Sequence, residues 1–264
     1  MRDRGKPGSP LLRTNLGFTV KLERVAIASW AAGIGAFAFV FGLLANDVAI
    51  FIRGQPQLQG TLTKLGVSSL GRPQDFLGLM FTFFALPIAI FAATQASAVR
   101  EEEATGRLDA LLVRPLGRRR WLFERCVVVA SGAVVIAAVA GALAWSGAAL
   151  RHSTVGWRPM LGAGLNCLPP TLLLFGLSVL CFGLAPRLTP AFALGSAVVA
   201  YLLELVGALV NAPSWLLDLS PFHHISPVPA APANGVAAFV MVGLGVAGAA
   251  AGIACLAHRD LVGA

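Results

Sequence analysis

Residues 100–125 read REEEATGRLDALLVRPLGRRRWLFER and separate two runs, 76–99 and 126–150, that contain no charged residue. This stretch carries seven of the twenty Lys and Arg residues of the 264-residue chain. Burying so many charges in hydrocarbon is too costly, whereas each flanking run exceeds the roughly 20 apolar residues that cross a bilayer. The stretch therefore predicts a charged loop between two membrane-spanning helices.

The remainder of the chain is equally apolar. Apolar residues make up 57% of the sequence and charged residues only 12%, and the mean hydropathy is +0.78, which is typical of a polytopic membrane protein. The uncharged runs predict an all-α membrane protein with six spans, at residues 25–46, 76–99, 126–150, 160–185, 188–211 and 236–257. We expect residues 25–257 to form one transmembrane domain, followed by a cytoplasmic tail, 258–264.

The basic residues predict the orientation of these spans. Fifteen of the twenty Lys and Arg residues fall on the side that holds both termini and the 100–125 loop. Basic loops stay in the cytoplasm, so both termini are expected there. The net charge of +8 then reflects contact with anionic lipid rather than with nucleic acid, for which no basic-aromatic pattern is present.

Two segments outside the spans have patterns of their own. Within residues 1–24, Leu12, Leu16 and Val20 recur every four residues among basic side chains, which predicts an elbow helix lying in the headgroup region. A frayed basic tail is the alternative. The segment 212–235 is apolar but interrupted by prolines, and it predicts a short re-entrant or interfacial helix buried against protein.

Small residues and prolines also fall inside the predicted spans. Glycines and alanines cluster in the first and sixth spans, where they would let helix backbones approach closely. Pro87 in the second span and the pair Pro169-Pro170 in the fourth remove backbone donors and predict kinks.

No enzyme class fits the sequence. Glu102, Glu103 and Arg107 match the Glu-Glu-x-x-x-Arg pattern of intramembrane prenyl-protein-type proteases, but the Phe-x-x-x-His and His-x-x-x-Asn/Asp elements of that family are missing. The chain also lacks a His-Glu-x-x-His metal motif and a Gly-x-x-x-x-Gly-Lys-Ser/Thr phosphate loop. We therefore predict no catalytic residue, no metal site and no ATPase motif in this chain.

The charged loop has the pattern of a docking element. Leu108, Leu111 and Leu112 share one face of a short helix that Pro115 would end. A short amphipathic helix at the membrane surface suits a groove on another protein.

The segment EEEATGRLDALLVRPLGRRRW, residues 101–121, resembles the first cytoplasmic loop of ABC type-2 exporter permeases, in which an acidic pair precedes a Gly, a Leu-rich turn, a Pro and basic residues. The SPFHH element at 220–224 resembles the bacterial members associated with polyketide-antibiotic and multidrug export. The resemblance implies a permease of the bacterial inner (plasma) membrane that exports hydrophobic or amphiphilic compounds such as drugs, antibiotics or lipids.

The resemblance also implies partners. A second permease half, identical or different, would complete the path, and cytosolic ATPase subunits would bind the ATP and Mg²⁺ that this chain does not bind. The 100–125 loop would then act as a coupling helix. Its transmission residues would be Glu101, Glu102, Glu103 and Arg107, and its docking face Leu108, Leu111 and Leu112. The glutamates could instead be only a solvated helix end.

Candidate residues of the substrate path follow from the same resemblance, and they are Phe81, Phe84, Gln95, Tyr201 and Glu204. The phenylalanines could equally serve plain packing. Glu204 is the one carboxylate deep within a predicted span, where an unpaired charge is costly. We expect it to face the cavity or the subunit interface, where it would attract cationic amphiphiles or bond to a partner subunit.

Two other functions stay open from the sequence. A membrane scaffold or immunity protein could keep this fold without transporting anything. A gradient-driven secondary transporter usually carries paired ionisable groups within its spans, and this chain offers one Glu.

Overall fold

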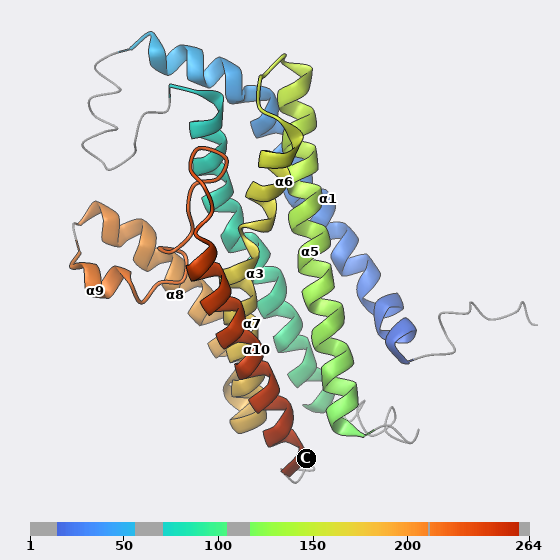
Figure 1. Cartoon of the computed structure of the whole chain (residues 1–264). Helices are drawn as coiled ribbons and strands as arrows, with labels where there is room; N and C mark the ends of the chain where they lie inside the picture. The colour runs from blue at the N-terminus through green and yellow to red at the C-terminus, as the bar shows by residue number, and fades with distance from the viewer. Residues whose placement is uncertain (1–14, 56–70, 105–116, 211, 259–264) are drawn as a thin grey trace, which may run out of the picture.

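The computed structural model describes residues 15–55, 71–104, 117–210 and 212–258 (Figure 1). The helices in these ranges are α1 (Asn15–Arg53), α3 (Pro73–Ala104), α5 (Arg118–Leu150), α6 (Trp157–Leu165), α7 (Leu168–Leu184), η2 (Pro186–Leu188), α8 (Thr189–Leu209), α9 (Ser214–Leu217) and α10 (Gly235–His258). Six helical stretches of the described chain are long and apolar enough to cross a membrane, so the prediction of an all-α protein with six spans is confirmed.

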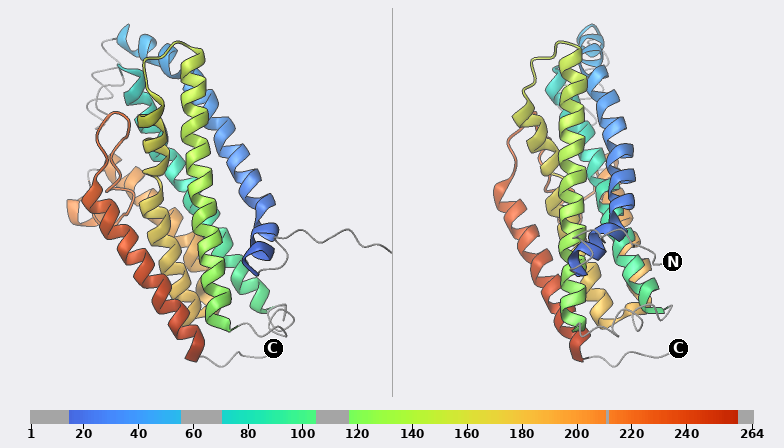
Figure 2. Two further views of the ribbon diagram at one scale, coloured as in Figure 1. Left: turned by 45° about the vertical axis from the view of Figure 1, so that its right-hand side comes forward. Right: turned by 90° about the vertical axis from the view of Figure 1, so that its right-hand side faces the viewer.

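Helix α1 is longer than a bilayer is thick. Its 39 residues extend for about 58 Å, against about 30 Å of hydrocarbon. Its first turns bend away from the axis of the rest, and its last turns lean over the opposite end of the bundle (Figures 1 and 2). The described part of the predicted elbow is thus continuous with the first span. At its other end the helix continues past residue 46, the predicted end of that span. No proline interrupts residues 15–53.

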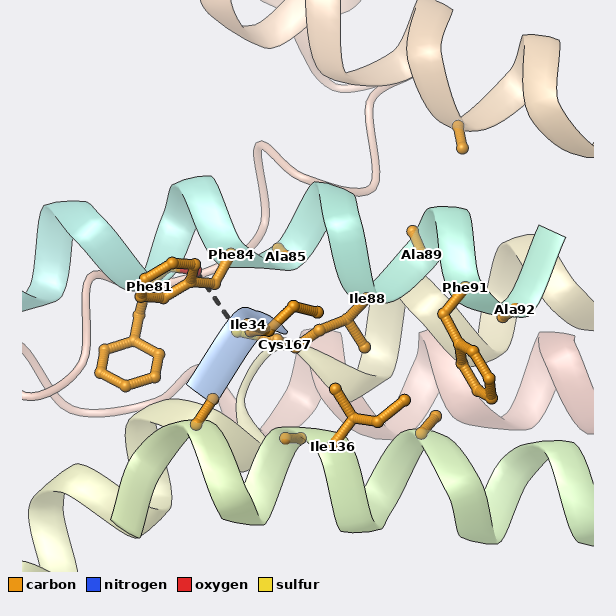
Figure 3. Close-up of a cluster of buried hydrophobic side chains, with 14 of the residues drawn as sticks. Ile34, Phe81, Phe84, Ala85, Ile88, Ala89, Phe91, Ala92, Ile136 and Cys167 are labelled. Atoms are coloured by element: carbon orange, nitrogen blue, oxygen red, sulfur yellow. Dashed lines mark hydrogen bonds between the residues drawn. The ribbon is translucent and has the colours of Figure 1, made fainter. Parts of the chain in front are cut away.

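The fourth span is broken, where the sequence predicted one kinked helix. Helix α6 ends at Leu165 and α7 begins at Leu168, because Pro169 and Pro170 lack the N–H that a helix interior needs and suit a first turn instead. Two side chains at the break bond to other segments. Asn166 Nδ2 donates to the Ser226 carbonyl at 2.8 Å, and Cys167 Sγ donates to the Phe81 carbonyl at 3.3 Å (Figure 3).

Two tightly packed helix pairs build the bundle, α1 with α5 and α7 with α10. Glycines allow both close approaches: a Cβ on Gly42 would collide with the Ala144 carbonyl, and one on Gly176 would collide with the Gly245 backbone. Helix α3 lies between the pairs, and its Ile88 points toward Ile34 and Ile136 in the core (Figure 3).

The segment between α8 and α10 folds back along α8. Ser220 Oγ donates to the Ala200 carbonyl at 2.8 Å, and the buried Phe222 ring packs edge-on against Tyr201 with centroids 5.4 Å apart. Ala200 lies nine residues before the end of α8, so the segment reaches well below the tip of that helix. The segment turns back as predicted, but its helix, the four-residue α9, has no buried residue.

Candidate functional site

Three helix ends meet at one end of the bundle, where α1 begins, α3 finishes and α5 begins (Figure 2). Exposed basic side chains surround this end, which we call the basic end: Lys21, Arg24, Arg119 and Arg120. Because α3 and α5 flank the segment 105–116, both attachments of that segment lie at the basic end.

A buried group of three charges joins these helix ends. Arg125 Nη2 of α5 lies 2.7 Å from Glu23 Oε1 of α1 and 3.2 Å from Glu102 Oε1 of α3. The side chains of Arg125 and Glu23 are only 5% and 8% exposed, whereas that of Glu102 is 22% exposed. We call this group the charge triad. Buried charges persist only when they are paired, so the triad fixes the three ends relative to one another.

The predicted coupling residues lie beside the triad or outside the described residues. Glu102 belongs to the triad, and Glu101 is exposed on the last turn of α3. The remaining predicted positions fall outside the described side chains, and these are Glu103, Arg107, Leu108, Leu111 and Leu112. Their coupling role stays a prediction.

Sequence reasoning missed Glu23 and Arg125 as functional candidates. Glu23 lies in the predicted elbow helix and Arg125 in the predicted charged loop, yet both are buried. The sequence does carry a signal for both residues. Arg125 directly precedes the apolar run 126–150, and Glu23 lies two residues before the apolar run that begins at 25. Both positions belong to the same predicted membrane face. Charges in such positions need partners of opposite sign from neighbouring helices.

An apolar pocket of about 540 Å³ opens between α1 and α3. Its lining consists of Ser29, Trp30, Gly33, Ile34, Phe37, Phe83, Phe84 and Pro87. The only hydroxyl in this lining, that of Ser29, already donates to the Ala26 carbonyl at 3.0 Å. The pocket has the size of a small-molecule site, and it offers aromatic and aliphatic contacts without a charge.

The residues predicted to line a substrate path are mostly buried in the core. Phe81, Phe84, Gln95 and Tyr201 are each 9% exposed or less. Phe84 reaches the pocket wall and contacts Phe81 edge-on, with centroids 5.6 Å apart. The structure therefore brings Phe84 to a cavity and leaves the other three in packing contacts, and a substrate role for them stays a prediction.

Glu204 is paired within the chain. It lies five residues before the end of α8, nearer the helix end than the sequence suggested, and its Oε2 is 2.8 Å from His223 Nδ1. Both side chains are about one-third exposed. The next histidine, His224, places Nε2 3.0 Å from the Asp218 carbonyl. Both histidines thus hold the returning segment in place, and no three potential metal ligands gather anywhere in the described ranges.

Comparison with known proteins identifies a family for this chain. The family described as the C-terminal domain of the multidrug efflux system permease Rv1217c matches residues 12–256. The chain belongs to this family. It is similar to the multidrug efflux system permease protein Rv1217c of Mycobacterium tuberculosis, with 29% identity over 226 residues. The match covers 83% of this chain and 41% of the relative, so the chain spans less than half of the relative's length.

Membership of this family bears on the predictions made from the loop and the spans. The resemblance to exporter permeases is confirmed at the level of a multidrug efflux permease. With six helices of membrane-spanning length in its described part, the chain is a multi-pass membrane protein of a permease family.

Proposed function

We propose that this chain is the membrane-embedded half of an ATP-driven exporter of apolar or amphiphilic compounds. The observation that carries the proposal is the match of the multidrug efflux permease family across nearly the whole six-span chain. The chain forms part of the translocation path, and separate cytosolic ATPase subunits bind ATP and Mg²⁺ and supply the energy.

Coupling to those ATPases runs through the loop 100–125. This loop links α3 to α5 at the basic end, and its leucine pattern suits a groove on a partner. The basic residues around it favour a cytoplasmic position, with both termini on the same side of the bacterial plasma membrane.

A second permease half completes the path. Support comes from the relative, which is more than twice as long as the region that this chain matches. Support also comes from α8, because most of its residues are not buried within this chain. Val199, Leu202 and Val206 are among its exposed side chains, and a second half would cover some of them.

The α1–α3 pocket supports the substrate class. Its volume of about 540 Å³ falls in the range of drug-sized sites, and its uncharged lining would bind apolar surface. Glu204, already paired with His223, does not supply a free carboxylate for cations at this pocket.

Co-purification tests the proposal. The tagged chain is expressed in its native host and solubilised from the membrane in mild detergent. We expect it to retain an ATPase subunit at a fixed ratio of ATPase to permease, measured by native mass spectrometry. Addition of ethidium, an amphiphilic dye, should raise ATP hydrolysis by the complex. A chain that purifies without any ATPase would contradict the proposal and favour a scaffold or a gradient-driven transporter.

A further inference from the structure

The charge triad differs from an ordinary surface ion pair in its burial and its charge balance. One guanidinium serves two carboxylates, and each of the three charges belongs to a different helix. A surface pair contributes little to stability because water screens it, whereas removing one partner from a buried group leaves an unpaired charge. The relative positions of α1, α3 and α5 at the basic end therefore depend on Arg125.

The two carboxylates hold Arg125 unequally. Glu23 lies closer to the guanidinium, at 2.7 Å against 3.2 Å, and is far more buried than Glu102. The Glu23–Arg125 contact, which is shorter and more buried, is the stronger one, since low-dielectric surroundings strengthen a charge-assisted hydrogen bond. Glu102 is thus the partner that can separate from Arg125 at lower cost.

Glu102 also lies nearer a helix end than Glu23 does. It is two residues from Ala104, where α3 ends and the segment 105–116 begins, whereas Glu23 lies within the continuous helix α1. The buried Arg125 Nε has no acceptor among the described residues, so the guanidinium has donor capacity left for a changed arrangement.

We propose that Arg125 is a positioning residue of the exporter, with Glu23 as its permanent partner and Glu102 as its releasable one. Release and recapture of Glu102 would allow the end of α3 to move against the α1–α5 pair. The inference rests on the proposed function, because it assigns a mechanism to the same coupling loop. It predicts that Glu23 and Glu102 have different roles although both touch Arg125.

The first test is Glu102→Gln in the complex with its ATPase subunits. This variant leaves one guanidinium and one carboxylate buried as a balanced pair, so the protein should fold and retain the ATPase. We expect ethidium transported per ATP hydrolysed to fall about tenfold in proteoliposomes, which is the range of ordinary coupling effects. The matched control is Asp47→Asn, which breaks the 2.7 Å pair with Arg151 that joins α1 and α5 at the opposite end. It should leave this ratio unchanged.

A second variant separates coupling from folding. Glu23→Gln combined with Arg125→Met removes the buried pair, and such replacements often preserve stability. The inference predicts an assembled complex that hydrolyses ATP with a similarly low transport ratio. A wild-type ratio in either the Glu102→Gln or the double variant would overturn the inference while leaving the proposed function intact. Failure of the wild-type chain to retain any ATPase would overturn both.

Discussion

Gly33 lies on the wall of the α1–α3 pocket, and a Cβ added there would meet no heavy atom within 4 Å. The position can therefore accept a Cβ without a clash, and a side chain extending from it would occupy pocket volume. We predict that Gly33→Leu keeps assembly and basal ATP hydrolysis but lowers ethidium transport by about tenfold, as expected when a binding pocket loses space. Unchanged ethidium transport by a folded Gly33→Leu protein would remove the pocket from the substrate path.

The charged residues show how far single positions could be predicted. Glu204 was recognised as a costly carboxylate because its apolar surroundings are visible in the sequence. Its partner His223 was not, since the contact depends on how the segment after α8 folds back. The triad was missed for the same reason: Glu23, Glu102 and Arg125 come together only through the packing of three helices.

At the scale of the elements, contact between α7 and α10 depends on glycines that face each other. An ideal Cβ on Gly176 would lie 2.7 Å from the Gly245 Cα, which no real contact tolerates. We predict that Gly176→Ala forces the two helices apart and destabilises the protein by about 1–3 kcal/mol, the usual cost of overpacking. Thermal unfolding in detergent measures this loss as a lower Tm.

Gly243 of α10 supplies the control for that substitution, since a Cβ there would meet nothing within 4 Å. Gly243→Ala should leave the Tm unchanged or raise it slightly, because alanine favours a helix. Equal effects of the two substitutions would show that helix propensity, and not close packing, sets the stability at these glycines.

The spans themselves were predictable because length and lack of charge mark them directly. Their ends and breaks were not. Pro169 and Pro170 indicated an irregularity in the fourth span. Prolines can either kink a helix or end it, so these two residues alone could not distinguish a kink from a break. At the break that the prolines cause, Asn166 and Cys167 bond to other segments, and those partners are invisible in a local pattern.

At the scale of the whole molecule, the chain contains a bundle with an apolar pocket and a buried charge triad beside its predicted docking segment. The loop motif led from sequence to the efflux permease family, which the match over residues 12–256 establishes. Substrate, second half and ATPase could not be predicted to the same depth, because their contacts involve surfaces of other molecules. The exposed apolar face of α8 is one such surface.

We propose that ATP hydrolysis by a separate subunit drives export through this permease. The most direct measurement reconstitutes the purified complex in proteoliposomes and follows ethidium movement with ATP, with a non-hydrolysable ATP analogue, and with a proton gradient alone. We expect transport only with hydrolysable ATP and only when the ATPase subunit is present. Transport driven by the proton gradient in the absence of ATP would contradict it.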